Sequence, residues 1–291
     1  MVFYNNFSRH RLLAPTSWSQ RWRRCTARQR WRQDRTRGRQ PEMNARQPIS
    51  GEGHCEHFLN PSTASAVEPH TAIGNGHSVL VLTDLVLETE CEVLRAAASA
   101  VASSEAAKPP TDRSRAWWSV QEVPGRMRLP IDKAPLGKPV VGLCDEVLLR
   151  VTQRLDGLLP SLLSALFGAS LMDIASRATM TGNPAITFSP REPALNVYQQ
   201  RGRFKPHRDE EALTIIVPLN GAGSFTGGGT AFWSTEDGRD ATAASSEPSF
   251  VLTPAAGTAV VFAGCVMHAA VAVQTGERCV LVASFSPTDD P

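Results

Sequence analysis

The spacing of apolar residues changes along the chain, and the change falls near residue 184. In residues 85–104 and again in residues 142–159, apolar side chains recur at the three- and four-residue spacing of one helix face. The first of these segments follows Ser78–Thr83, a short apolar run that is typical of a strand. The region from about residue 78 to residue 183 is therefore predicted to be mainly helical.

After residue 184 the pattern becomes one of short apolar runs separated by Gly, Pro, Asn and Ser. These runs are Ala194–Tyr198, Ala212–Leu219, Thr230–Trp233, Ser249–Leu252, Thr258–Phe262, Met267–Val273 and Arg278–Phe285. Many short strands with turn residues between them favour a sandwich or jelly roll over a parallel sheet. We expect an α+β fold in which N-terminal helices support a C-terminal double-stranded β-helix.

The composition divides the chain into three segments, which are a basic leader and linker at residues 1–77, a helical support region at 78–183 and a jelly-roll core at 184–291. Residues 1–46 contain twelve Arg and no Lys against two acidic residues, and the whole segment 1–77 is expected to be disordered. This leader fits a transit peptide, a nucleic-acid-binding arm, or upstream sequence translated in error with Met43 as the true start. No nucleic-acid-binding module follows it, so nucleic acid is not an expected partner.

The remaining composition excludes several classes of protein. Apolar residues make up 42% of the chain, enough for a sizeable core. No stretch reaches the roughly 18 continuous apolar residues of a membrane span, because the longest apolar region, residues 158–172, is broken by Pro160 and Gly168. The six Cys form no Cys-x-x-Cys pair, which favours free thiols in a reducing compartment. We expect an intracellular protein, cytoplasmic or organellar, that does not bind membranes.

The candidate chemistry is concentrated in four residues of the C-terminal segment: His207, Asp209, His268 and Arg278. His207 and Asp209 are two residues apart just before the run Ala212–Leu219, so at the start of that strand they would point to the same face. His268 opens another run. Two imidazoles and one carboxylate can hold a metal while leaving positions open, the set that suits non-haem Fe(II) oxygen chemistry.

Arg278 is a candidate for holding an acidic co-substrate beside that metal, because its forked cation matches a carboxylate. If Gln274–Gly276 is a three-residue hairpin loop with Gly276 in the left-handed conformation, Arg278 pairs with Ala272. Ala272 shares a strand face with His268, roughly 13 Å away along the strand. A two-residue loop would turn Arg278 away from the metal.

The span from Leu195 to Phe285 contains a series of short motifs: Asn196-Val-Tyr198, Gly202, Phe204, Lys205-Pro-His207-Arg-Asp209, Leu219-Asn220, Phe225, Gly228-Gly229-Thr230-x-Phe232, Pro254-x-x-Gly257-x-x-Val260-x-Phe262, His268 and Gly276-x-Arg278. With these motifs the span resembles the Fe(II)- and 2-oxoglutarate-dependent dioxygenases, in particular the prolyl 4-hydroxylase-like branch. The anchoring residue is Arg where the collagen-type enzymes usually have Lys. Outside this span nothing names a substrate.

The resemblance implies that His207, Asp209 and His268 are the catalytic iron ligands, and that Arg278 binds the distal carboxylate of 2-oxoglutarate with a hydrogen bond added by Tyr198. It further implies a hydroxylase that uses O₂ and 2-oxoglutarate, releases succinate and CO₂, and oxidises a C–H bond of a small-molecule substrate or of a peptidyl residue such as proline. Dependence on L-ascorbate is implied by the family alone.

Two other functions stay open at this point. One is a cupin-like metal enzyme that does not use 2-oxoglutarate, for which Arg278 would have no diacid to bind. The other is a non-catalytic jelly-roll binding module in which the His and Asp residues are structural. The sequence leaves the primary substrate, the position of hydroxylation and the oligomeric state undetermined.

Overall fold

The structure is a computed structural model, and it describes residues 79–108, 124–158, 180–183, 185–221, 223–233 and 247–288, together with the backbone of strand β1 (His57–Leu59). Most of the predicted leader and linker, and the apolar segment beyond residue 158, lie outside the described residues. The strand predicted at Ser78–Thr83 is β2 (Val79–Leu82).

Both predicted helices are present, as α3 (Glu88–Ala107) and α4 (Lys138–Leu158). Helix α3 begins where the Glu90 carboxylate accepts a hydrogen bond from the Leu87 backbone N–H at 2.9 Å. Each helix buries one stripe at helical spacing, formed by Cys91, Leu94, Ala98 and Ala102 in α3 and by Cys144, Val147, Leu148, Val151 and Leu155 in α4. Among the described residues, neither helix is long and apolar enough to cross a membrane.

The larger of the sheets is antiparallel and has the order β1-β2-β11-β7-β14-β5-β3, with β4 paired to β14. Its further strands are β3 (Arg126–Pro130), β4 (Ile186–Phe188), β5 (Ala194–Tyr198), β7 (Leu213–Pro218), β11 (Ala259–Ala263) and β14 (Arg278–Pro287). Strands β2 and β3, which precede the predicted jelly-roll segment, are thus part of the same sheet as its strands.

A smaller antiparallel sheet has the order β10-β9-β12-β6, and β8 pairs with β13. These strands are β6 (Phe204–His207), β8 (Phe225–Gly227), β9 (Thr230–Phe232), β10 (Phe250–Leu252), β12 (His268–Ala270) and β13 (Val273–Gly276). Within the large sheet β5 pairs with β14 and β7 with β11, and within the small sheet β6 pairs with β12 and β9 with β10. Strands early in the C-terminal segment thus pair with strands late in it, and the pairs follow one another inward along the chain. This arrangement is that of a double-stranded β-helix, so the predicted fold is confirmed.

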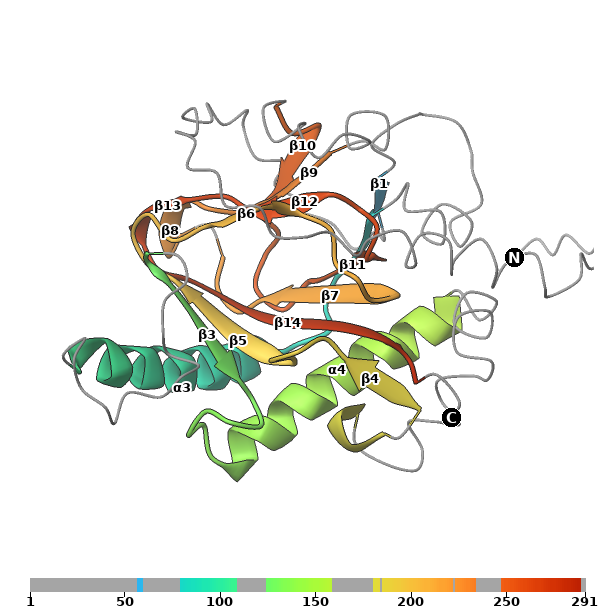
Figure 1. Cartoon of the computed structure of the whole chain (residues 1–291), viewed down its shortest axis with the longest axis horizontal. Helices are drawn as coiled ribbons and strands as arrows, with labels where there is room; N and C mark the ends of the chain where they lie inside the picture. The colour runs from blue at the N-terminus through green and yellow to red at the C-terminus, as the bar shows by residue number, and fades with distance from the viewer. Residues whose placement is uncertain are drawn as a thin grey trace, which may run out of the picture. The chain divides into compact units, whose positions relative to one another are not determined.

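The large sheet separates two apolar cores, because successive strand residues point to opposite faces. In β14, Cys279, Leu281 and Ala283 belong to the core that contains the helix stripes. Val280 and Val282 belong instead to a second core, shared with Phe232 of the small sheet. The helices therefore cover one face of the large sheet and the small sheet covers the other (Figure 1). The inward polar residues of the large sheet consequently face a space between the two sheets.

Several strands were not predicted, and their residues explain why. In β3 the arginines 126 and 128 alternate with Met127 and Leu129. From the sequence the arginine face would be expected to contact solvent, but in the structure both arginines line a pocket. Strand β6 lies at a sheet edge and contains Lys205 and Pro206, which interrupt any apolar run. The run predicted at Met267–Val273 is divided between β12 and β13.

Candidate metal centre and its pocket

His207, Asp209 and His268 converge at one end of the small sheet. His207 ends β6 and His268 begins β12, and the register of the two strands places the histidines directly opposite each other. Their ring centroids are 4.2 Å apart. One potential ligand atom from each of the three residues lies within 4.8 Å of the others, and no second such group of His, Cys, Asp or Glu occurs in the described part of the chain.

The local placement of His207 and Asp209 differs from the prediction. We expected both at the start of the following strand, but His207 closes β6 and Asp209 lies in the connection before β7. The connection is fixed by a hydrogen bond from the Asp209 backbone N–H to the Gly264 carbonyl at 2.9 Å. The two side chains still approach each other, with His207 Nε2 3.4 Å from Asp209 Oδ1.

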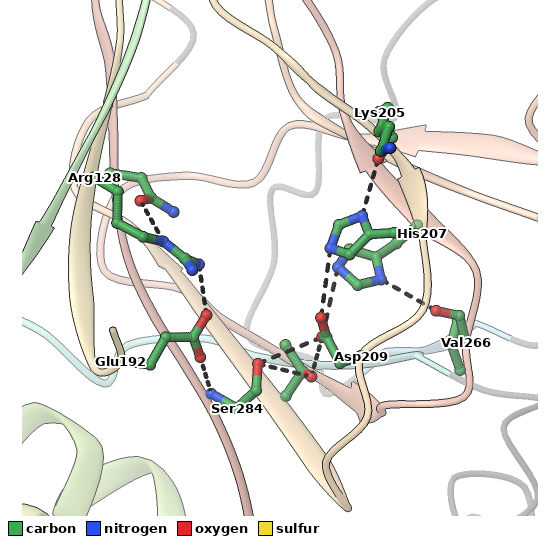
Figure 2. Close-up of polar contacts among 10 residues, drawn as sticks. Arg128, Glu192, Lys205, His207, Asp209, Val266 and Ser284 are labelled. Carbon is green, nitrogen blue, oxygen red and sulfur yellow. Dashed lines mark hydrogen bonds and ion pairs between the residues drawn. The ribbon is translucent and has the colours of Figure 1, made fainter. Parts of the chain in front are cut away.

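Both imidazoles are held in the same tautomer by a backbone carbonyl two residues earlier in the chain. His207 Nδ1 lies 2.9 Å from the carbonyl oxygen of Lys205, and His268 Nδ1 lies 3.1 Å from that of Val266 (Figure 2). A carbonyl oxygen only accepts, so each Nδ1 carries the hydrogen and each Nε2 keeps its lone pair. His268 Nε2 is 3.7 Å from Asp209 Oδ2, so both free nitrogens face the carboxylate. Metal-binding histidines are oriented in this way.

The charges of the group match those of metal ligands. Burial, with a smaller contribution from the neighbouring His207, lowers the pKa of His268 to about 4, so this imidazole is neutral at pH 7. Burial acts to raise the pKa of Asp209, but the nearby His268 and His207 imidazoles and the hydrogen bond from Thr214 outweigh it and lower the pKa. A neutral imidazole and an ionised carboxylate are the forms that bind divalent metals.

The three residues fit a ferrous ion. Ligand atoms about 2.1 Å from one ion and at right angles to each other are about 3 Å apart. The separations from His207 Nε2 to Asp209 Oδ1, 3.4 Å, and from His268 Nε2 to Asp209 Oδ2, 3.7 Å, exceed that by less than 1 Å, which rotations of the side chains can close. Two nitrogens and one carboxylate leave further coordination positions open, as in non-haem Fe(II) oxygenases.

Arg278 begins β14 and lines the same pocket as the three candidate ligands. Its side chain is buried, with Nη2 donating to Thr230 Oγ1 at 3.0 Å and the guanidinium carbon 5.4 Å from the centroid of the Tyr198 ring. Tyr198 is the partner of Arg278 in the β5–β14 register. A hydrogen bond from Tyr198 to 2-oxoglutarate stays a prediction.

The prediction that a hairpin loop at Gln274–Gly276 pairs Arg278 with Ala272 is wrong. Arg278 pairs with Tyr198, not with Ala272, because β14 joins the large sheet while β13 pairs with β8. Gly276 does adopt the predicted left-handed conformation, with φ at +77°. Arg278 faces the pocket because it shares a face of β14 with Val280, Val282 and Ser284, which also line it.

Sequence reasoning missed several polar residues around the site. Thr214 Oγ1 donates a hydrogen bond to Asp209 Oδ2, and Ser284 Oγ donates to the same oxygen at 3.4 Å. Beyond Ser284 lies a partly buried ion pair between Arg128 and Glu192. Thr214 and Ser284 are hydroxyl residues at inward-facing positions of otherwise apolar strands, and this pattern could have identified them in the sequence. For Glu192, which lies outside the strands, the sequence carried none.

Searches against known sequences give no match to this chain, either among protein-family models or among curated proteins. Among solved structures it is similar to the viral collagen prolyl hydroxylase vCPH of Paramecium Bursaria Chlorella virus-1, with 14% identity over 72% of this chain and 96% of that one, and a TM-score of 0.40. It is also similar to a Pseudomonas putida prolyl-4-hydroxylase, with 14% identity over 76% and 97% and a TM-score of 0.45.

A third similar structure is HygX from Streptomyces hygroscopicus, determined with nickel, 2-oxoglutarate and hygromycin B bound. Its identity to this chain is 12%, over 77% of this chain and 88% of that one, with a TM-score of 0.45.

Proposed function

We propose that the chain is an Fe(II)- and 2-oxoglutarate-dependent dioxygenase that hydroxylates a C–H bond of a peptidyl or small-molecule substrate and releases succinate and CO₂. One observation carries the proposal. Two imidazole nitrogens and an ionised carboxylate converge in the same pocket as Arg278, a buried guanidinium. A cupin-like metal site needs no such cation, and a binding module needs neither the cation nor the free Nε2 atoms.

Each residue has a distinct role in this proposal. His207, Asp209 and His268 would hold the ferrous ion, which when bound supplies the coordination of 2-oxoglutarate and the activation of O₂. Arg278 would bind the distal carboxylate of 2-oxoglutarate through paired N–H groups, while its bond to Thr230 fixes the direction of the guanidinium. Its burial excludes water that would compete for the carboxylate.

The finer parts of the proposal rest on the sequence motifs. A peptidyl prolyl residue is one candidate for the primary substrate, because the motifs resemble those of the prolyl 4-hydroxylase-like branch. L-Ascorbate, as a reductant that maintains the ferrous state, is part of the same proposal and has the same basis.

The test is an anaerobic titration of the purified protein with Fe(II) and 2-oxoglutarate, followed by the visible charge-transfer band of the chelated co-substrate. We expect the band in the wild type and its loss in His207→Ala, Asp209→Ala and His268→Ala. The exposed Arg203, outside the pocket, provides the control Arg203→Gln, which should keep the band. Exposure to O₂ should then release succinate from the wild type.

Other outcomes would identify the other functions. Fe(II) binding without any band would indicate a metal enzyme that does not use 2-oxoglutarate. Protein that is folded by circular dichroism but binds neither Fe(II) nor 2-oxoglutarate would indicate a non-catalytic jelly-roll module, and the proposal would then be abandoned.

A further inference from the structure

The pocket contains more positive charge than the proposed reaction uses. Besides Arg278 it is lined by Arg126 and Arg128, which both come from β3. Met127 and Leu129, the residues that alternate with them, pack into the core on the helix side of the sheet. The pleat of β3 therefore turns both arginine side chains toward the pocket.

Arg128 is held along one edge by two partners. Its Nη2 forms an ion pair with Glu192 Oε1 at 2.5 Å, and its Nε donates to Asn196 Oδ1 at 3.3 Å. A guanidinium carries five N–H groups, and these contacts use two of them. The other three have no partner among the described residues, while the side chain lines the pocket and is 21% exposed. Arg128 thus has donors available for a ligand.

Glu192 fixes this guanidinium relative to the candidate metal centre. Its side chain is 5% exposed, and its Oε2 accepts a hydrogen bond from the Ser284 backbone N–H. The hydroxyl of Ser284 in turn donates to Asp209 at 3.4 Å. Figure 2 shows the resulting chain from Arg128 through Glu192 and Ser284 to Asp209, with His207 on the far side of the intervening space. The cation consequently has a set position opposite the candidate ligands.

Arg126 adds a second cation to the same wall. It is 7% exposed, and its guanidinium carbon lies 4.0 Å from the centroid of the Phe204 ring. Phe204 in turn packs edge-on against the His207 ring, with centroids 4.4 Å apart. Apart from the groups assigned to metal and 2-oxoglutarate, the described lining residues include two guanidiniums and one carboxylate, Glu192. A wall of that composition favours an anionic ligand.

We propose that Arg128, aided by Arg126, anchors an anionic group of the primary substrate, a carboxylate or a phosphate, so that the C–H bond to be oxidised lies at the metal. This inference rests on the proposed function, since it assigns the substrate class of the same site. The paired N–H groups of arginine match both anions. The competing explanation is that the Arg128–Glu192 pair only holds β3 in place.

The test uses the anaerobic complex of the full chain with Fe(II) and 2-oxoglutarate, and two matched pairs of probes. N-Benzoylglycine is compared with its amide, and phenyl phosphate with phenol, by their effect on the charge-transfer band. We expect at least one anion to perturb the band with an affinity about tenfold or more above that of its neutral partner. The pair that responds identifies carboxylate or phosphate as the group recognised.

The variant for this test removes both partners of the ion pair, because Arg128→Gln alone would leave Glu192 buried without its cation. In Arg128→Gln/Glu192→Gln the new amide oxygen at position 192 can still accept the Ser284 N–H. The preference for the anion should be lost in this double variant, reduced in Arg128→Lys and retained in Arg203→Gln. Circular dichroism checks that each variant is folded.

Three results would overturn the inference: equal binding of the neutral probes, no response to either anion, or a double variant that keeps the preference. A double variant that loses affinity for 2-oxoglutarate itself would also overturn it, since Arg128 would then bind the co-substrate. These results are distinguishable from failure of the proposed function, because in that case no charge-transfer band forms at all.

Discussion

Thr214 donates a hydrogen bond to Oδ2 of Asp209, the same carboxylate oxygen that lies 3.7 Å from His268 Nε2. Thr214 is on β7 and is fully buried, so its hydroxyl approaches from a fixed direction. The bond from Ser284 to this oxygen is longer, at 3.4 Å. The rotation of the Asp209 carboxylate is therefore set mainly by a strand of the large sheet rather than by the connection that carries Asp209.

Thr214→Val should weaken Fe(II) binding by about 10- to 100-fold, because a partner that orients a ligand is removed without a change of shape. The measurement is an anaerobic titration with Fe(II), repeated with Co(II). Thr152→Val is the matched control, since Thr152 is a buried threonine of α4 whose hydroxyl donates to the Leu149 carbonyl. It should lower stability without changing metal affinity. Wild-type affinity in Thr214→Val would show that the hydroxyl does not orient Asp209.

Arg278→Lys should raise the Kd for 2-oxoglutarate by about 10- to 100-fold. Lysine keeps the positive charge but loses the forked donor pair, and a hydrogen bond to a charged group contributes about 1.5–3 kcal/mol. The Kd is obtained by titrating the charge-transfer band at saturating Fe(II), with Arg203→Lys as the control for a surface arginine. An unchanged Kd would place the co-substrate away from Arg278.

The metal-free protein should lose stability as the pH falls from about 6.5 to about 4. Burial lowers the pKa of His268 to about 4 from its ordinary 6.5. Above pH 6.5 the imidazole is neutral in both the folded and the unfolded chain and has no effect. Between the two pKa values the unfolded chain binds a proton that the folded chain excludes, so the free energy of unfolding falls, by up to about 3 kcal/mol.

Urea unfolding at pH 7.5 and pH 5 measures this difference. His268→Gln cannot be protonated, so its free energy of unfolding should change less between the two pH values than that of the wild type. Equal changes in the two proteins would mean that His268 is not the group responsible.

Gly228→Ala should destabilise the protein by about 1–3 kcal/mol and weaken 2-oxoglutarate binding. Gly228 has φ of +69°, which a residue with a Cβ adopts at a cost. The new Cβ would lie 2.8 Å from the Phe225 ring and 3.4 Å from Arg278 Cδ, so the strain would reach the side chain of Arg278, the proposed anchor of 2-oxoglutarate. Gly223→Ala is the control, because no atom lies within 4 Å of its added Cβ. Urea unfolding and the charge-transfer titration check both effects, and a Gly228→Ala protein with wild-type values would refute them.

The strands that could be predicted from the sequence are those with apolar residues on both faces. Ala194–Tyr198 matches β5 at both ends, and Arg278–Phe285 differs from β14 by two residues at its end. Both lie between two cores, so both faces carry apolar side chains. Strand β3 has arginines toward the pocket, and β6 is an edge strand with a proline, so neither has that pattern.

The candidate site was predictable in its residue types and less so in its geometry. The pair His207 and Asp209 and the isolated His268 do come together, because β6 and β12 are neighbours in the small sheet. Arg278 reaches the pocket from the large sheet, which local loop geometry could not reveal, since it depends on pairing with a strand about 80 residues earlier in the chain. The residues around Asp209, including Ser284 and Glu192, depend on the same long-range pairing.

The place of β3 at the edge of the large sheet has a practical consequence. Among the described residues it pairs only with β5, it precedes β5 to β14 in the chain, and none of the candidate metal ligands lies on it. If Arg126 and Arg128 anchor the substrate as proposed, laboratory evolution toward new substrates can concentrate on alternate positions of one five-residue strand. Such variants would keep the three candidate metal ligands, and Glu192 would be exchanged together with Arg128 because the two form an ion pair.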